Sequence, residues 1–370
     1  MKCSELFKQI EKRIPPAIAW QRDNVGLQVG DPDSEILKIL ITLDPSPEAV
    51  REAIEKGANL IISHHPLLFN PLKQINTSGN HYQRTTTLLI KNDITLYSAH
   101  TNFDSIPDGV SFSLAQKLGL TNISVLNRTQ ETHFKLLVYV PTASHDTVAK
   151  ALFASGAGVI GNYENCSFST AGTGTFEGNT FSNPTTGTQG KLETVEETKL
   201  EVVVPRWLLK SVLSSLKQSH PYEEPAYDVY PLQNSVSEFG LGAIGEYEEE
   251  IEPNKFLDIV SSKLNCKGLR YTQGKQTKIK RVAVLGGSGS NYHAQAISAN
   301  VDAFVTADVT YHSFLDSEKS LWFIDAGHFE TEFPALESFK KIIQTIDSSL
   351  EVLITDATTF PISYHNDRRS

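Results

Sequence analysis

The sequence has little of what marks secreted, disulfide-stabilised or membrane proteins. Its three cysteines, Cys3, Cys166 and Cys266, lie far apart and form no C-x-x-C pair, which predicts neither a disulfide framework nor a cysteine zinc site. No segment approaches the roughly 18 uninterrupted apolar residues of a membrane helix, and the first residues contain no apolar stretch of the kind found in secretory signals. We therefore expect a cytoplasmic protein with no membrane partner.

Positive charge is also scarce. The chain has 33 Lys and Arg against 43 Asp and Glu, which gives a formal net charge of -10 at pH 7. Non-specific nucleic-acid binding depends on Lys and Arg that neutralise phosphates, so we do not expect nucleic acid as a partner. The 370 residues, of which 39% are hydrophobic, are sufficient for two or three globular domains.

Strand and helix patterns alternate in the first and last thirds of the chain. The predicted strands span residues 36–43, 59–63, 94–98, 280–285, 303–306, 321–325 and 351–355. The predicted helices span residues 4–14, 46–57, 81–92, 291–299 and 332–345. Strands that alternate with helices are typical of βαβ units, so we expect an α/β core with mostly parallel sheets.

The middle third follows a different pattern. Strands are predicted at residues 134–140, 200–204 and 226–229, and helices at 144–154 and 207–218. This order is close to that of ferredoxin-like α+β domains, and residues 155–200 are rich in Gly, Thr, Ser and Asn. We therefore interpret this segment as a domain inserted into the α/β core. The acidic run 246–252 is predicted to be a solvated connector.

Histidines and carboxylates follow three of the predicted strands at the point where each strand ends. The three clusters are Ser63-His64-His65-Pro66, His100-Thr101-Asn102-Phe103-Asp104 and Gly327-His328-Phe329-Glu330-Thr331-Glu332. Ligands of open α/β sheets bind at the carboxyl ends of the parallel strands, so the fold could bring the clusters together. Imidazoles and carboxylates are ligands for zinc, iron, manganese, cobalt and nickel.

The spacing within these clusters is compatible with a metal site. His328 and Glu332 are four residues apart, so one helical turn would place them on the same face. A carboxylate such as Asp104 can bridge two ions that lie roughly 3.5–4 Å apart. Together with His64 and His65, these residues would leave open positions for water or substrate, as in catalytic sites. From the pattern alone, histidines without any ligand role remain an equal alternative.

A glycine-rich turn follows the predicted strand 280–285. Backbone N–H groups of Gly287, Ser288 and Gly289 could cradle an anion at the start of the next helix. The alternative is a tight turn that needs positive φ. The motif matches neither of the common phosphate-binding signatures, so both interpretations stay open.

Four further residues are candidates for supporting roles. Asp308 and His312 follow another strand and could move protons, although Asp308 could equally be a helix cap. His100 could orient Asp104 or be an ordinary buried polar residue. Glu330 is a candidate general base or, alternatively, a solvated acid in the first turn of a helix.

Five motifs together resemble the Nif-three-like family, whose members are also described as type 2 homologs of GTP cyclohydrolase I. The motifs are Asp23-Asn24-Val25-Gly26-Leu27-Gln28-Val29-Gly30, Ser63-His64-His65-Pro66, Ser98-Ala99-His100-Thr101-Asn102-Phe103-Asp104, Gly286-Gly287-Ser288-Gly289 and Gly327-His328-Phe329-Glu330-Thr331-Glu332. The resemblance implies a two-lobed α/β core that holds two divalent metal ions, zinc or alternatively iron, manganese, cobalt or nickel. The implied ligands are His64, His65, Asp104, His328 and Glu332.

The same resemblance implies an assembly and an activity. It implies a homohexamer, built as a trimer of dimers, with the sites facing a central cavity. Residues 127–236 resemble a PII-like and CutA-like insert between core segments 1–126 and 237–370. The implied activity is that of a metal-dependent hydrolase of the GTP cyclohydrolase type, acting on a nucleotide-like substrate. The alternative is a metal-binding regulatory or scaffold protein whose insert senses a small molecule.

Overall fold

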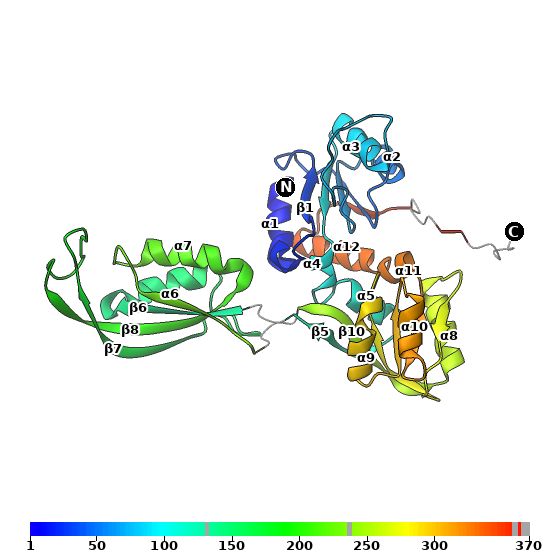
Figure 1. The fold of residues 1–370 in the computed structure, drawn as a ribbon. Coiled ribbons are helices and arrows are strands. Elements are labelled where there is room, and N and C mark those ends of the chain that lie inside the picture. Colours follow the sequence, from blue (N-terminus) through cyan, green and yellow to red (C-terminus); the bar gives the residue numbers. More distant parts are fainter. Residues whose placement is uncertain (130–132, 235–238, 357–361, 364–370) are drawn as a thin grey trace. The chain divides into compact units, whose positions relative to one another are not determined.

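The computed structural model describes residues 1–129, 133–234, 239–356 and 362–363. The chain divides into two compact units (Figure 1). The first unit consists of Met1–Arg128 together with Phe239–Ser370, and the second unit is Thr129–Glu238. Among the described residues, no helix combines the length and the apolar composition that crossing a membrane requires.

The first unit contains a five-stranded sheet in the order β1-β4-β3-β2-β15. Its strands are β1 (Gly26–Val29), β2 (Ile39–Thr42), β3 (Leu60–Ser63), β4 (Thr95–Ser98) and β15 (Val352–Ile354). The last four pair in parallel, and β1 is antiparallel to β4. Every residue of β2, β3 and β4 is buried, because helices cover both faces of such a sheet. The helices packed with it are α1 (Cys3–Arg13), α2 (Pro47–Lys56), α3 (His81–Lys91) and α12 (Ala335–Ile346).

Helix α2 begins and ends where its sequence predicts. The hydroxyl of Ser46 accepts a hydrogen bond from the backbone N–H of Ala49 at 3.0 Å, and Gly57 ends the helix with φ of +71°. We expect Ser46→Ala to lower the free energy of unfolding by about 1 kcal/mol, because one N–H at the helix start loses its acceptor. Urea unfolding measures this loss, and Ser46→Thr, which keeps the hydroxyl, should lose clearly less. Equal losses in both variants would contradict the capping role.

The second sheet of the first unit has the order β11-β14-β13-β12-β10-β5. Its strands are β5 (Thr121–Arg128), β10 (Gly240–Ile251), β11 (Arg270–Thr272), β12 (Ile279–Val284), β13 (Ala303–Thr306) and β14 (Trp322–Asp325). The parallel strands β12, β13 and β14 form its centre, and β5, β10 and β11 pair antiparallel. The prediction of a solvated connector at 246–252 was wrong for most of that run, because β10 continues to Ile251.

Helices and short turns complete the first unit. The helices are α4 (Thr101–Asp104), α5 (Val110–Leu118), α8 (Pro253–Leu264), α9 (His293–Ser298), α10 (Tyr311–Ser317) and α11 (His328–Glu332). The 3-10 turns in this unit are η1 (Pro16–Ile18) and η4 (Ser290–Tyr292). The α/β class predicted from the sequence is therefore confirmed, with antiparallel strands added around the parallel centres.

The predicted helix at residues 332–345 is divided in the structure. Helix α11 ends at Glu332, and α12 begins at Ala335. Pro334 lies between them and cannot continue a helix, because it lacks an N–H and its ring clashes with the preceding turn. The division leaves α11 as a separate five-residue helix that carries His328 and Glu332.

The second unit is a four-stranded antiparallel sheet in the order β7-β8-β6-β9. Its elements in chain order are β6 (His133–Pro141), η2 (Thr142–Ser144), α6 (His145–Ala154), β7 (Ser167–Glu177), β8 (Leu192–Pro205), η3 (Arg206–Leu208), α7 (Leu209–Ser219) and β9 (Tyr227–Pro231). The β-α-β-β-α-β order agrees with the sequence pattern. Strand β7 was not predicted, because most of its side chains are exposed and it therefore shows no apolar alternation.

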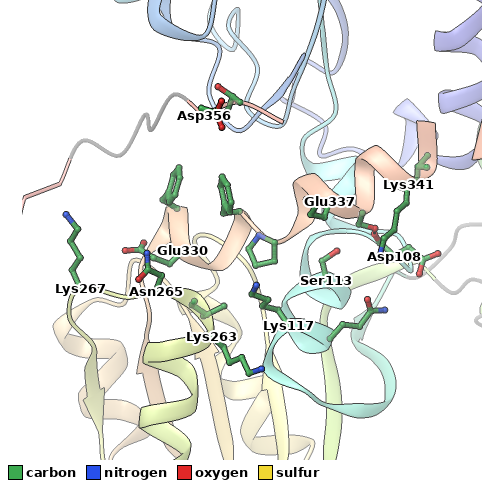
Figure 2. Close-up of a pocket in the computed structure, with 18 of the residues that line it drawn as sticks. Asp108, Ser113, Lys117, Lys263, Asn265, Lys267, Glu330, Glu337, Lys341 and Asp356 are labelled. Atoms are coloured by element: carbon green, nitrogen blue, oxygen red, sulfur yellow. The ribbon is translucent and has the colours of Figure 1, made fainter. Parts of the chain in front are cut away.

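A cavity of about 1190 Å³ lies in the first unit (Figure 2). Its walls come from α5, α8, α11 and α12, and they include Lys117, Lys263, Phe329 and Lys341. Glu330, which is only 7% exposed, also lines the cavity. The short helix α11 therefore borders this cavity in addition to carrying His328 and Glu332.

Candidate metal centre

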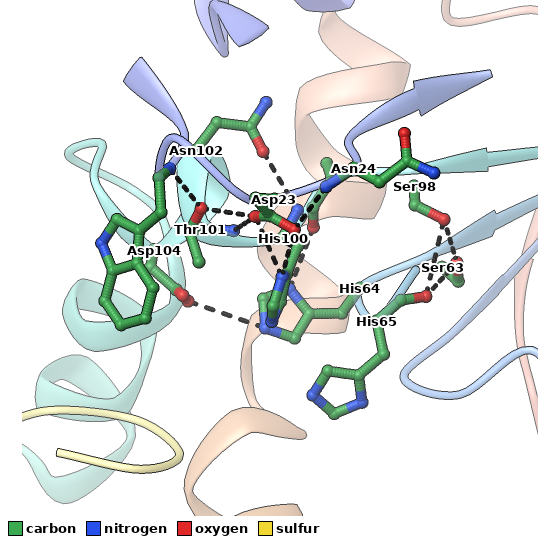
Figure 3. A network of polar contacts seen from close by, with 12 residues as sticks. Asp23, Asn24, Ser63, His64, His65, Ser98, His100, Thr101, Asn102 and Asp104 are labelled. Atoms are coloured by element: carbon green, nitrogen blue, oxygen red, sulfur yellow. Dashed lines mark hydrogen bonds and ion pairs between the residues drawn. The ribbon is translucent and has the colours of Figure 1, made fainter. Parts of the chain in front are cut away.

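The three predicted clusters come from two different sheets of the first unit. His64 and His65 follow β3, His100 follows β4 and directly precedes α4, and His328 begins α11 after β14. Each follows the carboxyl end of a parallel strand, where open α/β sheets place their ligand sites. Figure 3 shows the part of this arrangement that β3, β4 and α4 contribute.

Glu332 lies at the centre of the cluster. Its Oε1 is 3.0 Å from Nε2 of His328 and 3.7 Å from Nε2 of His64, and its Oε2 is 3.1 Å from Nε2 of His65. On the other side, Nε2 of His64 is 3.6 Å from Oδ1 of Asp104. The structure thus brings the five predicted metal ligands into one group of facing nitrogen and oxygen atoms.

Several of these atoms lack the hydrogen bonds that buried polar groups normally make. In the described parts of the chain, Nε2 of His64, Oδ1 of Asp104 and Oε2 of Glu332 are buried and have no hydrogen-bond partner. Two ligands of a tetrahedral zinc ion, each bonded at about 2.0–2.1 Å, lie roughly 3.3 Å apart. The observed separations are close to that value, so the donor set fits a divalent cation.

The electrostatics of the cluster are strongly coupled. Burial raises the pKa of Glu332, but the imidazoles of His64, His328 and His65 outweigh it and hold the pKa well below its usual range. Burial lowers the pKa of both His65 and His328, yet their carboxylate partners raise it to about 10 and about 11. Protons on these two imidazoles therefore balance the buried negative charge when a cation does not.

Among the carboxylates of the group, the negative charge of Asp104 is the least compensated by nearby positive charge. Burial is the largest influence on it and raises its pKa to about 7, while the nearby His64 opposes the rise. Keeping this carboxylate ionised at neutral pH requires additional positive charge beside it. A bound cation would supply that charge at the position that Asp104 and His64 share.

His64 and His65 each make a second contact, through Nδ1, the ring nitrogen that faces away from the other ligand atoms. Nδ1 of His64 lies 3.0 Å from the carbonyl oxygen of Ala99, and Nδ1 of His65 lies 2.8 Å from Oδ1 of Asp44. Such bonds orient the ring so that Nε2 points into the site. Our sequence interpretation missed Asp44, although its position just after β2 is the same kind of strand end that identified the histidines.

Asp308 plays the corresponding part for His328. Its Oδ2 lies 2.7 Å from Nδ1 of His328 and also accepts a hydrogen bond from the Ser288 hydroxyl. The hydrogen bond from His328 is the main reason that the pKa of Asp308 is lowered. The alternative of a helix cap was wrong, because the N-cap of α10 is Thr310, whose hydroxyl accepts from Ser313.

His100 is oriented by a carboxylate other than Asp104. Its Nδ1 lies 2.9 Å from Oδ1 of Asp23 (Figure 3), and its ligand atom lies within 4.8 Å of those of His64 and His65. His100 is thus placed as a further possible ligand. Burial raises the pKa of Asp23, but hydrogen bonds from His100 and Thr101 prevail and lower it to about 2.

We expect Asp23→Asn to weaken metal binding about 10–100-fold, because the amide cannot accept all the hydrogen bonds that hold His100 in place. Competition with a chromophoric chelator measures the affinity. The matched control is Asp33→Asn, which removes an exposed carboxylate from the same part of the chain. Unchanged affinity in Asp23→Asn would show that the orientation of His100 does not matter to the metal.

The glycine-rich turn supports the site by its shape. Gly287 has φ of +66°, and a Cβ atom there would lie 2.2 Å from Oε1 of Glu332. The N–H groups of Gly287 and Gly289 already donate to the hydroxyls of Thr331 and Thr306. Two of the donors proposed for an anion are therefore occupied, and anion binding by Gly287, Ser288 and Gly289 stays a prediction.

The two remaining candidates lie apart from the facing ligand atoms. His312 is exposed on α10, where its ring contacts Tyr311. Glu330 is buried rather than solvated, and it lines the cavity on the other side of α11. Catalytic roles for Asp308, His312 and Glu330 stay predictions.

A family model described as Duf34/NIF3 (NGG1p interacting factor 3) matches residues 1–361. The chain belongs to this family. A Duf34/NIF3 relative from Halalkalibacterium halodurans, named GTP cyclohydrolase 1 type 2 homolog, is 39% identical over 97% of this chain and 98% of its own length. A Staphylococcus aureus protein of the same name is 36% identical over 98% of this chain and 100% of its own.

Solved structures agree with this Duf34/NIF3 assignment. A Bacillus cereus protein related to NIF3 is 38% identical, with a TM-score of 0.81 over 98% of this chain and 99% of its own. A Staphylococcus aureus protein is 32% identical, with a TM-score of 0.79 over the same shares. The family resemblance predicted from the five motifs is therefore confirmed.

Proposed function

We propose that this Duf34/NIF3 protein holds two divalent metal ions and hydrolyses a nucleotide-like substrate. The observation that supports the proposal most directly is the group of buried, facing atoms of His64, Asp104 and Glu332 that lack hydrogen-bond partners in the described parts of the chain. The name GTP cyclohydrolase 1 type 2 homolog, carried by the relatives, supports the substrate class.

The residues divide into two sets that share Glu332. His64 and Asp104, with His100 as a further candidate, would hold one ion, and His65 and His328 would hold the other. Bound divalent ions supply the Lewis acidity that activates water and polarises the attacked group. The chain itself orients the imidazoles through backbone and carboxylate partners, and it keeps the ligand atoms of Glu332 away from solvent.

Activity with quantified metal content tests the proposal. The purified full-length protein should be assayed against GTP, other nucleotides and a chromogenic phosphodiester. We expect turnover that falls at least about 1000-fold in His65→Ala, because one metal position loses a ligand that Asp44 orients. The matched control is His81→Ala, which changes the first residue of α3. Undiminished turnover in His65→Ala or in chelator-treated protein would contradict the metal-dependent mechanism.

The assembly is part of the same proposal. We propose a cytoplasmic homohexamer, arranged as a trimer of dimers, with a small-molecule substrate and no nucleic-acid partner. Native mass spectrometry should detect six chains of 40.9 kDa each. A monomer at micromolar concentration would contradict the hexamer, without bearing on the metal ligands of the single chain.

A metal-binding regulatory or scaffold protein is the second candidate function. The observation that favours it is a cavity of about 670 Å³ in the second unit, bordered by Tyr139, Glu197 and Tyr222, which has a size typical of small-molecule sites. Absence of turnover on every substrate, together with small-molecule binding by the full chain that Tyr222→Ala abolishes, would favour this function over hydrolysis.

A further inference from the structure

The cavity beside α11 lies on the side of that helix away from the metal ligands. His328 and Glu332 are four residues apart and share one helical face. Glu330 is two positions from each of them, which is about 200° around the helix axis. Its side chain accordingly lines the cavity (Figure 2). Glu330 belongs to neither group of possible metal-ligand atoms among the described residues.

Positive charge is concentrated on one part of this cavity. Lys117 comes from α5 and Lys263 from α8, and these two helices pack against each other. Neither lysine, nor Lys341 from α12, forms an ion pair with any described residue. Lysines that lack an acidic partner attract anionic groups such as phosphate.

Two of the acidic residues in the wall are already engaged with other cations. Asp108 lies 3.5 Å from a guanidinium nitrogen of Arg13. Asp356 lies 2.7 Å from the ammonium of Lys56. Two other acidic residues of the wall, Glu330 and Glu337, form no ion pair with a described residue, so we place a bound anion at Lys117 and Lys263, which come from the packed helices α5 and α8.

An aromatic surface forms another part of the wall. The rings of Phe329 and Phe333 stack with their centroids 5.2 Å apart and their planes inclined by 27°. Phe333 nevertheless remains 40% exposed. An exposed ring beside a second ring is a suitable surface for stacking a flat heterocycle.

A buried acceptor completes the cavity. Glu330 is 93% buried, since only 7% of it is exposed, and its Oε2 has no hydrogen-bond partner among the described residues. A buried oxygen that accepts no hydrogen bond is energetically unfavourable. An N–H group of a ligand in the cavity would remove that penalty.

We propose that this cavity binds a nucleotide, with the base against Phe333, a base N–H donating to Glu330, and the phosphates on Lys117 and Lys263. The volume of about 1190 Å³ is ample for such a ligand. The site is separate from the metal centre, but a ligand there contacts the helix that carries two metal ligands. The cavity is therefore placed to serve as an effector site.

Calorimetric titration of the full-length, chelator-treated protein with ADP and with GDP tests the proposal. Removing the metal keeps binding at the metal centre out of the measurement, so the result does not depend on whether the protein is a hydrolase. We expect at least one of the two nucleotides to bind. The double variant Lys117→Ala/Lys263→Ala should bind it at least 10-fold more weakly, and inorganic phosphate should bind the wild type at least 10-fold more weakly.

Two further variants separate the site from general charge effects. Phe333→Ala should weaken nucleotide binding about 10-fold and leave phosphate binding unchanged, because only the base contacts the ring. Lys340→Ala removes a lysine of α12 that does not line the cavity, and it should bind like the wild type. Absence of binding of both nucleotides, or equal binding by the wild type and the double lysine variant, would overturn the proposal.

Discussion

Replacing Glu332 by glutamine is expected to leave less than one metal ion on each chain, in place of the proposed two. The two carboxylate oxygens lie within 3.7 Å of nitrogen atoms from three different histidines. Glutamine keeps the shape of the side chain but has no negative charge, and its amide nitrogen cannot coordinate a cation as a carboxylate does. We expect the affinity of both metal positions to fall by a factor of at least about 1000.

The same change should destabilise the metal-free protein. His65 and His328 are protonated at neutral pH, since their pKa values are about 10 and about 11. Removing the carboxylate between them would leave two half-buried imidazolium groups without that counter-charge, which destabilises the folded state. The expected result is a lower melting temperature in chelator than that of the wild type.

Elemental analysis after dialysis measures the metal content of Glu332→Gln. The matched control is Glu337→Gln, which makes the same chemical change on the exposed side of α12 and should keep the wild-type metal content. If Glu332→Gln retained two ions per chain, the proposed arrangement of the metal centre would be wrong. If it lost metal and kept its turnover, the centre would exist but would not be catalytic.

Metal binding is expected to release about two protons per chain near pH 7.5. At this pH His65 and His328 of the metal-free protein lie well below their pKa values of about 10 and about 11, so both are protonated. Each imidazole must lose its proton before its nitrogen can bind a metal ion. Affinity should therefore fall as pH is lowered, by up to about 100-fold per pH unit.

Calorimetry in buffers of different ionisation enthalpy gives the number of protons released. Asp308→Asn provides an internal control, because it removes a hydrogen bond that raises the pKa of His328. Proton release by this variant should move from about two toward one. A wild-type value near zero would show that the histidines are neutral before the metal binds, against the charge balance described for the cluster.

The metal ligands could be predicted because each follows a buried strand, and a short run of apolar residues in the sequence predicts such a strand. His64 and His65 follow a fully buried β3, and His328 follows a fully buried β14. The partners Asp23 and Asp44 were missed for a physical reason. Asp44 follows β2 at the same kind of strand end, and Asp23 opens one of the five motifs, but the sequence does not show which histidine each carboxylate contacts, because both contacts are made across the fold.

The errors in the fold have equally local causes. Strand β7 exposes most of its side chains, so no alternation of apolar residues marks it. Strand β10 changes from a buried start at Gly240 to an exposed acidic end, and its pairing with β5 and β12 shows that the acidic part is sheet. Pro334 was visible in the sequence, and its effect on the helix at 332–345 follows directly from proline stereochemistry.

Where the chain passes between the two units, the nearest strands are paired within each unit. In the first unit Arg128 is paired with Gly240 across β5 and β10, and in the second Phe134 is paired with Pro231 across β6 and β9. The two chain ends of each unit are therefore held next to each other by strand pairing within that unit. Neither unit depends on the other to bring its chain ends together. The second unit is in this sense an independent inserted domain. A domain could be gained or lost between the paired strands β5 and β10. Such a change would not disturb β3, β4 or β14, the strands that precede the metal ligands.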